Sequence, residues 1–275
     1  MTGLPHDYGK TVLSVSNVSV TLGGMPVLRD LSLEVKNVHR PGVAQGQVVG
    51  LLGPSGMGKT TLFRILAGLD KPDTGTVLVE EEGRPVERGM VGVVAQNYPL
   101  FAHRTVLSNL AVAGRQAGLS AAQSATRANE TLMRFGLEAH AKKYPALLSG
   151  GQRQRVAIAQ QFMCSDHFLL MDEPFSGLDL LAKERVSDFI REMAASDDLK
   201  TIILVTHDIG SAVEVADTIW VLGRDRDAQG NVIPGARIQK TYDLIEYGLA
   251  WHEHIASMPE YDAVCREIRA IFPLL

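Results

Sequence analysis

Hydrophobic and polar residues alternate along the first part of the chain. The segment TVLSVSNVSVTL, residues 11–22, has a period of two, and VLRDLSLEV, residues 27–35, follows it after the turn-forming GGMP. This pattern predicts two strands of an N-terminal antiparallel sheet. The next residues, 36–46, are polar and contain proline and glycine, so we expect a loop there.

Four later segments are short continuous apolar runs. They are QVVGLL (47–52), VGVVA (91–95), FLLM (168–171) and TIILVT (201–206). Such runs are typical of strands that are buried on both faces of a parallel sheet. Helical patterns lie between them, and strands that alternate with helices indicate an α/β fold.

The longest helical stretch extends from about residue 97 to 165. Ser120 and Gln123 form a capping-box pattern at its centre, and Gly136 is placed to end the helix that follows. We expect residues 1–222 to form the main domain, with this helical subdomain inserted, and 223–275 to form a C-terminal hairpin and helical tail. The sequence does not decide whether the tail packs on the domain or is a regulatory surface.

Composition narrows the classes of protein further. The chain has 275 residues, 45% of them hydrophobic, which suffices for a sizeable core, and its net charge of −4 gives no electrostatic footprint for nucleic acid. Cys164 and Cys265 lie far apart and show neither a metal-binding spacing nor a disulfide framework, which fits a reducing cytosol. We expect no signal peptide and no spanning helix, because no apolar run approaches about 18 residues.

A phosphate-binding motif begins where the first buried run ends. GPSGMGKTT fits the pattern G-x-x-x-x-G-K-[ST]. Backbone N–H groups of such a loop, together with the start of the next helix, surround phosphate oxygens. Lys59 should reach the β- and γ-phosphates of a nucleotide, Thr60 should ligate Mg²⁺ and Thr61 should lie near the α-phosphate. The predicted phosphate-binding residues are Gly53, Pro54, Ser55, Gly56, Met57, Gly58, Lys59, Thr60 and Thr61.

Polar side chains also follow the other three buried runs. Gln96 follows the second, Asp172 and Glu173 follow the third, and His207 follows the fourth. Ligands of open α/β sheets bind beyond the carboxyl ends of the strands, so these side chains should meet the glycine loop at one edge. Asp172 would then hold Mg²⁺, Glu173 would polarise the attacking water, and His207 would sense the γ-phosphate.

Each of these residues also has an ordinary structural interpretation. An Asp-Glu pair after a strand is usually a solvated loop, and a single histidine is more often a structural group than a catalytic one. The neighbouring phosphate loop favours the catalytic interpretation.

With these residues in order, the chain resembles the ATP-binding subunits of ABC transporters, over roughly residues 12–222. After the glycine loop comes VVAQNYPLFAHRTVLSNL, which is similar to a Q-loop region. It is followed, in this order, by the signature LSGGQRQRVAIAQ, the strand motif FLLMDEP, the D-loop SGLD and the switch segment VTHD. LSGGQ separates this family from other P-loop proteins. The resemblance implies a P-loop NTPase core with a mostly parallel sheet, an N-terminal antiparallel β subdomain and an inserted α-helical subdomain.

The resemblance also assigns roles to residues. In that family two subunits enclose two ATP molecules, so the signature of one subunit would close over the γ-phosphate bound at the phosphate loop of the other. The same phosphate would then face two helix N-termini, one from each subunit. Glu173 would be the general base, with His207 and Gln96 completing the catalytic set, and Thr60, Gln96 and Asp172 would hold Mg²⁺. Asp179 would communicate across the dimer. The signature residues are Ser149, Gly150, Gly151 and Gln152.

The function that the resemblance implies is ATP hydrolysis coupled to transport. ATP binding would close a dimer, expected to be a homodimer, and Gln96 would couple the nucleotide site to separate transmembrane permease subunits at the cytoplasmic face of the inner membrane. The tail MPEYDAVCREIRAIF is similar to importer cassettes of the nitrate/sulfonate/taurine group. An importer of a small solute with an extracytoplasmic solute-binding protein is therefore expected, and no nucleic acid partner. The cargo stays open.

Two other classes of protein fit this sequence less well. A soluble ABC-type ATPase acting on DNA would carry a long coiled coil before the signature, whereas the interval here shows no sustained heptads, and translation-factor types carry two cassettes in one chain. A P-loop kinase or GTPase would leave LSGGQ unexplained, and no Asn-Lys-x-Asp motif occurs.

Leu22 aligns with the position where the family usually places an aromatic residue that stacks on adenine. Leucine covers a base by apolar contact but lacks aromatic stacking, which contributes about 0.5–1.5 kcal/mol beyond area burial. We expect weaker discrimination of ATP from GTP than a tyrosine would give. Turnover of both nucleotides by wild type and Leu22→Tyr should show a higher ATP/GTP ratio in the variant, and an unchanged ratio would contradict the alignment.

Overall fold

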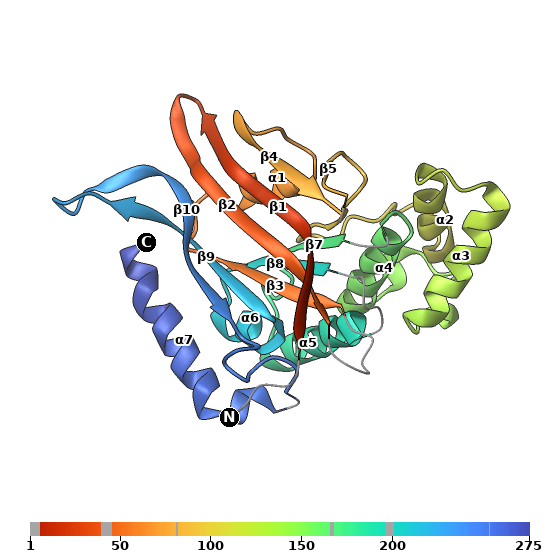
Figure 1. Ribbon diagram of the computed structural model, residues 1–275. Coiled ribbons are helices and arrows are strands. Elements are labelled where there is room, and N and C mark those ends of the chain that lie inside the picture. The colour runs from red at the N-terminus through yellow and green to blue at the C-terminus, as the bar shows by residue number, and fades with distance from the viewer. Residues whose placement is uncertain (1–5, 40–45, 81, 166–167, 196–200, 253) are drawn as a thin grey trace.

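The computed structural model describes residues 6–39, 46–80, 82–165, 168–195, 201–252 and 254–275. Within these residues, ten strands form one hydrogen-bonded sheet in the order β5–β4–β1–β2–β10–β9–β3–β8–β7–β6 (Figure 1). The strands are β1 (Asp7–Leu22), β2 (Met25–His39), β3 (Gln47–Leu52), β4 (Thr74–Val79), β5 (Arg84–Pro85), β6 (Gly92–Val94), β7 (Phe168–Asp172), β8 (Thr201–Thr206), β9 (Thr218–Arg226) and β10 (Val232–Asp243).

The N-terminal part of the sheet is antiparallel, as the alternating pattern predicts. β1 pairs with β2 on one side and with β4 on the other, both antiparallel. The expectation of a loop from residue 36 onward is wrong at its start, because β2 continues to His39, which pairs with Asp7. Residues 40–45 of that segment lie outside the described residues.

The core of the sheet is parallel, as the apolar runs predict. β3 pairs in parallel with β8 and β9, and β7 pairs in parallel with β8 and β6. Successive residues on these strands enter different cores: Leu51 and Ile203 belong to one, Leu52 and Leu204 to the other. Both faces of the parallel strands are therefore covered, which explains why their sequences are continuously apolar.

The C-terminal hairpin joins the two parts of the sheet. β10 pairs antiparallel with β9 and makes a parallel contact with β2. β9 spans the boundary at residue 222 that the sequence analysis expects between the main domain and the tail. The hairpin therefore belongs to the same hydrogen-bonded sheet as the core.

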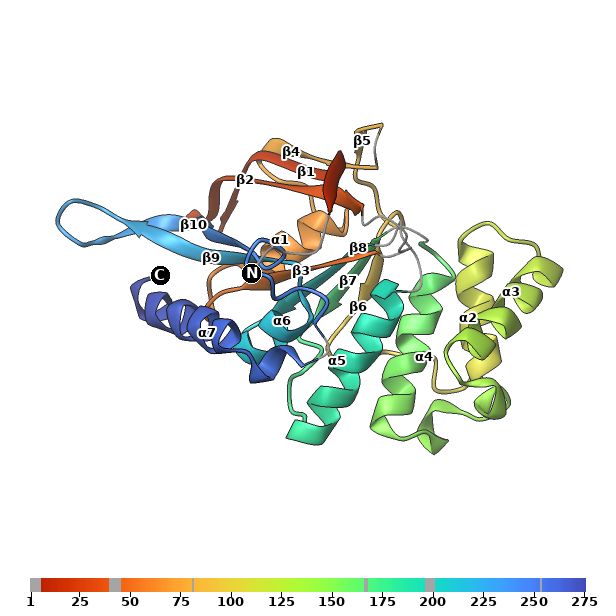
Figure 2. The ribbon, with the colours of Figure 1, turned by 60° about the horizontal axis from the view of Figure 1, so that its bottom comes forward.

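Helices cover the two faces of the core unequally. α1 lies between the antiparallel strands and the core, and its Leu62, Phe63, Ile65 and Leu66 join side chains of both in one cluster. Figure 2 shows α4, α5 and α6 on the opposite face. The helices are α1 (Lys59–Leu66), α2 (Val106–Gln116), α3 (Ala121–Arg134), α4 (Gly150–Phe162), α5 (Leu180–Ala195), α6 (Ile209–Val215) and α7 (Pro259–Ile271), with short 3₁₀ turns η1 (Glu138–His140), η2 (Pro145–Leu147), η3 (Ile255–Ser257) and η4 (Phe272–Leu274).

The segment between β6 and β7 is helical, as predicted. Ser120 and Gln123 form a complete capping box at the start of α3, and Gly136 follows the helix with a left-handed φ of 61°. Helix α2 packs against α3 and α4 (Figure 2). Among the described residues, no helix is both long and apolar enough to cross a membrane.

The C-terminal tail is a packed helix. α7 lies against α6 and buries Val264, Cys265 and Ile268 in the core cluster. Beyond α7, Arg226 of β9 donates a hydrogen bond to the carbonyl of Leu274 at 3.1 Å. The tail therefore packs on the domain through the buried face of α7 and through the contact at Leu274.

Because Ile268 is fully buried, Ile268→Ala should reduce the free energy of unfolding by about 2–5 kcal/mol. Urea denaturation followed by circular dichroism measures this, with the exposed Arg266→Ala on the same helix as the matched control. Equal, small effects for the two variants would mean that the tail is not part of the cooperative core.

Candidate functional site

The glycine loop connects β3 to α1, in the strand–loop–helix arrangement that the sequence predicts. Gly58 has a left-handed φ of 86°, and a Cβ there would lie 2.9 Å from Cγ1 of Val27. A Cβ on Gly53 would lie 2.7 Å from the carbonyl oxygen of Leu222. These glycines are required by backbone conformation and by close packing of the loop against β2 and β9.

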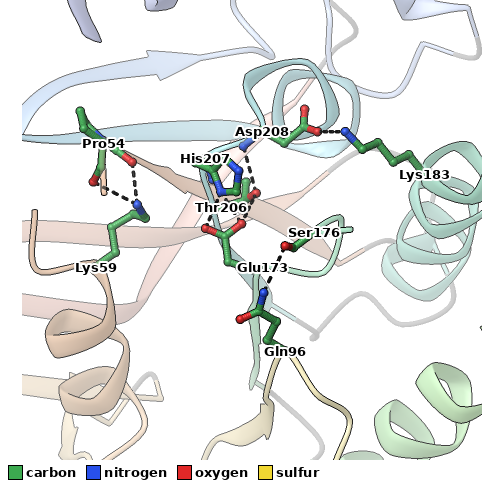
Figure 3. A network of polar contacts seen from close by, with 10 residues as sticks. Pro54, Lys59, Gln96, Glu173, Ser176, Lys183, Thr206, His207 and Asp208 are labelled. Atoms are coloured by element: carbon green, nitrogen blue, oxygen red, sulfur yellow. Dashed lines mark hydrogen bonds and ion pairs between the residues drawn. The ribbon is translucent and has the colours of Figure 1, made fainter. Parts of the chain in front are cut away.

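Lys59 is folded over this loop. Its Nζ donates to the carbonyl oxygens of Gly53, at 2.6 Å, and Pro54, at 3.1 Å (Figure 3). Burial lowers the pKa of Lys59, and the carboxylates of Glu173 and Asp172 act in the opposite direction. The ammonium group is therefore held in the loop by neutral acceptors that an anionic ligand can replace.

Glu173 occupies a strained position immediately after β7. Its φ is 48°, unusual for a residue with a side chain, and its N–H donates to the carbonyl of Val205 at 2.8 Å. Its side chain is only 15% exposed. The backbone thus turns away from the strand direction and aims the carboxylate at the end of β8.

Two residues at the end of β8 hold that carboxylate. Thr206 Oγ1 donates to Glu173 Oε2 at 3.0 Å, and the backbone N–H of His207 donates to the same oxygen at 3.4 Å. His207 Nδ1 lies 2.9 Å from Glu173 Oε1 (Figure 3). A carboxylate only accepts, so this contact places a proton on Nδ1. The predicted meeting of Glu173 and His207 at one sheet edge is therefore observed.

Asp172 is the last residue of β7, next to Glu173. Burial raises the pKa of Asp172, the neighbouring charge of Glu173 raises it further, and Lys59 lowers it. This local excess of negative charge suits a cation. Among the described residues no cluster of three or more His, Cys, Asp or Glu side chains could hold a metal. A divalent cation here would need further oxygen ligands, and the hydroxyl of Thr60, the amide of Gln96 and a bound phosphate are of the kind that Mg²⁺ prefers.

Gln96 follows β6 and is linked to the segment after β7. Its Nε2 donates to Oγ of Ser176 at 3.1 Å, and the hydroxyl of Tyr98 donates to the carbonyl of Pro174 at 3.3 Å. Asp179, three residues beyond Ser176, accepts a hydrogen bond from the N–H of Ala182 at 2.8 Å at the start of α5. The Gln96 contact therefore connects the Q-loop region to the D-loop segment, and the Asp179 contact connects that segment to α5.

Sequence reasoning missed Thr206, Asp208 and Lys183. Asp208 caps α6 by accepting from the N–H of Ser211 at 3.0 Å, and it forms an ion pair with Lys183 of α5 (Figure 3). An Asp directly before a helix is a recognisable capping signal. The Thr206 and Lys183 contacts join segments far apart along the chain, and no local pattern indicates them.

The signature residues lie at the start of α4. Ser149 caps this helix: its Oγ accepts from the N–H of Gln152 at 3.3 Å, and Gln152 Oε1 accepts from the N–H of Ser149 at 3.0 Å. Gly150 and Gly151 are exposed, and a Cβ on either would meet no atom of the described residues within 4 Å. These residues line a cavity of about 1050 Å³ whose lining includes no residue of the glycine loop. Within one chain, the N-terminus of α4 and the glycine loop at the N-terminus of α1 therefore do not form a shared anion-binding site.

Leu22 ends β1 and pairs with Met25 across the first hairpin. Its side chain is 57% exposed. It is therefore accessible to a ligand, and the described residues do not bury it in the core.

Comparisons with known proteins agree with these motifs. The model of a family described as "ABC transporter" matches residues 37–176. A Chlorella vulgaris protein named "Probable sulfate/thiosulfate import ATP-binding protein" is 39% identical over 211 residues, covering 76% of this chain and 86% of that protein. A sulfate/thiosulfate import ATP-binding protein of Rhizobium meliloti is also 39% identical, but this chain spans only 57% of its length.

A solved structure supports the same fold. The structure of cbiO1 from Clostridium perfringens, described as part of the ABC transporter complex cbiONQ, has a TM-score of 0.72 and 25% sequence identity. The likeness covers 96% of each chain. It therefore includes the C-terminal hairpin and tail as well as the core.

Thr206→Val removes the hydroxyl that donates to Glu173 and accepts from the N–H of Asp208 at 3.1 Å. Because both partners are partly buried, we expect a loss of about 1–3 kcal/mol in the free energy of unfolding at neutral pH. Thr206→Ser keeps the hydroxyl and should lose only about 0.8 kcal/mol for the missing methyl group. Chemical denaturation compares them, and a larger loss for the serine variant would contradict the hydrogen-bonding role.

Proposed function

This chain belongs to the ABC transporter family, and we propose that it is the ATP-hydrolysing subunit of an importer for a small solute. The observation that carries the proposal is the meeting of Lys59, Glu173 and His207 at the carboxyl edge of the parallel strands. The import names of the similar proteins support the direction of transport. They also argue against a DNA- or ribosome-directed ATPase.

Residues 53–61 would bind the triphosphate of ATP. Lys59 would exchange its two carbonyl partners for β- and γ-phosphate oxygens, and the loop N–H groups at the start of α1 would complete the cradle. Leu22, at the exposed end of β1, would cover the adenine. Thr60, Asp172 and Gln96 would hold Mg²⁺, which when bound neutralises charge on the phosphates.

Glu173 would act as the general base. Its carboxylate would take a proton from a water whose oxygen forms a bond to the γ-phosphorus as the bond to the β-phosphate oxygen breaks. The strained backbone and the contacts from Thr206 and His207 hold that carboxylate in one orientation. His207 would contact the γ-phosphate and Gln96 would help to place the water.

The complete site would need a second subunit. The exposed start of α4, with Ser149, Gly150, Gly151 and Gln152, would close over the γ-phosphate held at Lys59 of a second copy in a homodimer. Asp179, at the start of α5, would meet that copy. In this assignment residues 1–222 are the ATPase domain, about 97–165 its helical subdomain, and 223–275 the C-terminal hairpin and tail.

The large cavity beside α4 would receive the permease. Its lining combines apolar side chains of the segment after Gln96, such as Leu100, with Arg153 of α4 and Phe189 of α5. Gln96 is hydrogen-bonded to Ser176, so an occupant of this cavity would lie close to a contact with the segment that follows β7 and Glu173. We place the subunit peripherally at the cytoplasmic face of the inner membrane, in a complex with a permease and an extracytoplasmic solute-binding protein.

Glu173→Gln should bind ATP, accumulate as a dimer and hydrolyse at least about 100-fold more slowly, because the amide cannot take a proton from water. Analytical ultracentrifugation with Mg-ATP and a phosphate-release assay measure the two effects. Lys59→Ala is the matched control, since it should lose nucleotide affinity and therefore not dimerise. A Glu173→Gln chain that stays monomeric and turns over normally would refute the proposed function.

A further inference from the structure

His140, in the 3₁₀ turn η1, contacts the signature motif. Its Nε2 lies 3.0 Å from Nε2 of Gln152, the residue that closes the capping box of α4. Neither the glycine-loop motif nor the signature pattern includes His140. The contact is therefore a property of this chain that its motifs do not explain.

The hydrogen-bonding chemistry determines the state of the ring. A backbone N–H only donates, so the contact with Ser149 N identifies the Gln152 atom at 3.0 Å as its carbonyl oxygen. The other end of the amide is then an NH₂ group, which also only donates, and His140 Nε2 must accept. The ring is therefore neutral with its proton on Nδ1, an atom that is buried and has no hydrogen-bond partner among the described residues.

On the cavity side, the part of the chain that the structure describes places no carboxylate beside His140 that could pair with a protonated ring. His140 and Gln152 both line the 1050 Å³ cavity, and none of the described residues that line it is an Asp or a Glu. The flanking segment of His140 itself carries Glu138, Lys142 and Lys143. The titratable side chains that other elements contribute to the lining are Tyr98, Arg153, Arg155 and Arg185.

We propose that His140 is a positioning residue for the signature motif: its neutral ring holds the Gln152 amide in the capping box, and protonation releases it. A protonated Nε2 would set two donors against each other, and an amide that turned to accept from it would give up the N–H of Ser149. ATP-driven dimerisation should then weaken as the pH falls and the ring takes up a proton. This inference rests on the proposed function, in which the signature closes over the partner's phosphate.

The test uses the full chain carrying Glu173→Gln, with dimer dissociation constants measured by ultracentrifugation in Mg-ATP from pH 8 to pH 6. With His140 present, the dimer should weaken about three- to tenfold more over this range than with His140→Gln, whose amide oxygen accepts at every pH. His140→Leu removes the acceptor and should be weak at all pH values. In the unsubstituted chain, the NMR resonances of the Gln152 side-chain amide and of the His140 ring should change together as the pH is lowered.

The possible outcomes distinguish a failure of the positioning role of His140 from a failure of the proposed function. Equal pH slopes for the native and His140→Gln backgrounds, or a His140→Leu dimer as tight as the native one at pH 8, would overturn the positioning role. A dimer that tightens on protonation would also overturn it, since it would mean that the cation attracts phosphate directly. If no background dimerises with ATP at any pH, the proposed function itself fails.

Discussion

The candidate site depends on the parallel pairing of β3, β8, β7 and β6. Parallel strands point their carboxyl ends the same way, so each chain reversal after a strand occurs at one edge of the sheet. This edge brings together Lys59 of the glycine loop, Glu173 after β7 and His207 after β8. More than a hundred residues of sequence separate Lys59 from the other two. Without this pairing, the same residues would be isolated loop side chains.

Burial on both faces makes the pairing stable. Consecutive residues such as Leu51 and Leu52 enter different cores, one containing α1 and the antiparallel strands, the other containing α4 to α7. Helix α1, which begins at Lys59, is anchored between the two parts of the sheet by its buried side chains Leu62, Phe63, Ile65 and Leu66. Close packing of Gly58 on Val27 ties the loop itself to β2. The site is consequently built on a rigid support, as preorganised electrostatic sites require.

The strained backbone of Glu173 is stabilised by what surrounds it. A left-handed non-glycine residue is unfavourable by about 1–3 kcal/mol and persists only where neighbouring contacts compensate. Here its N–H is bonded to Val205, and its carboxylate accepts from Thr206 and His207. The end of β8 thus determines the orientation of a side chain that β7 presents, and Asp208 with Lys183 fixes the helix that follows.

Local chemistry in the sequence was sufficient to predict the first two strands, the four buried parallel strands, the C-terminal hairpin, the glycine loop, the Ser120 capping box and the α/β class, because each follows from periodicity or from residues close together in the chain. It also identified which side chains follow the strand ends. The short strands β4 and β5 were not predicted. Only the tertiary structure decided that β10 joins both parts of the sheet, that Thr206 holds Glu173, and that His140 contacts Gln152. It likewise separated the signature from the glycine loop within one chain. These features are contacts between distant segments, and their geometry depends on how the elements pack.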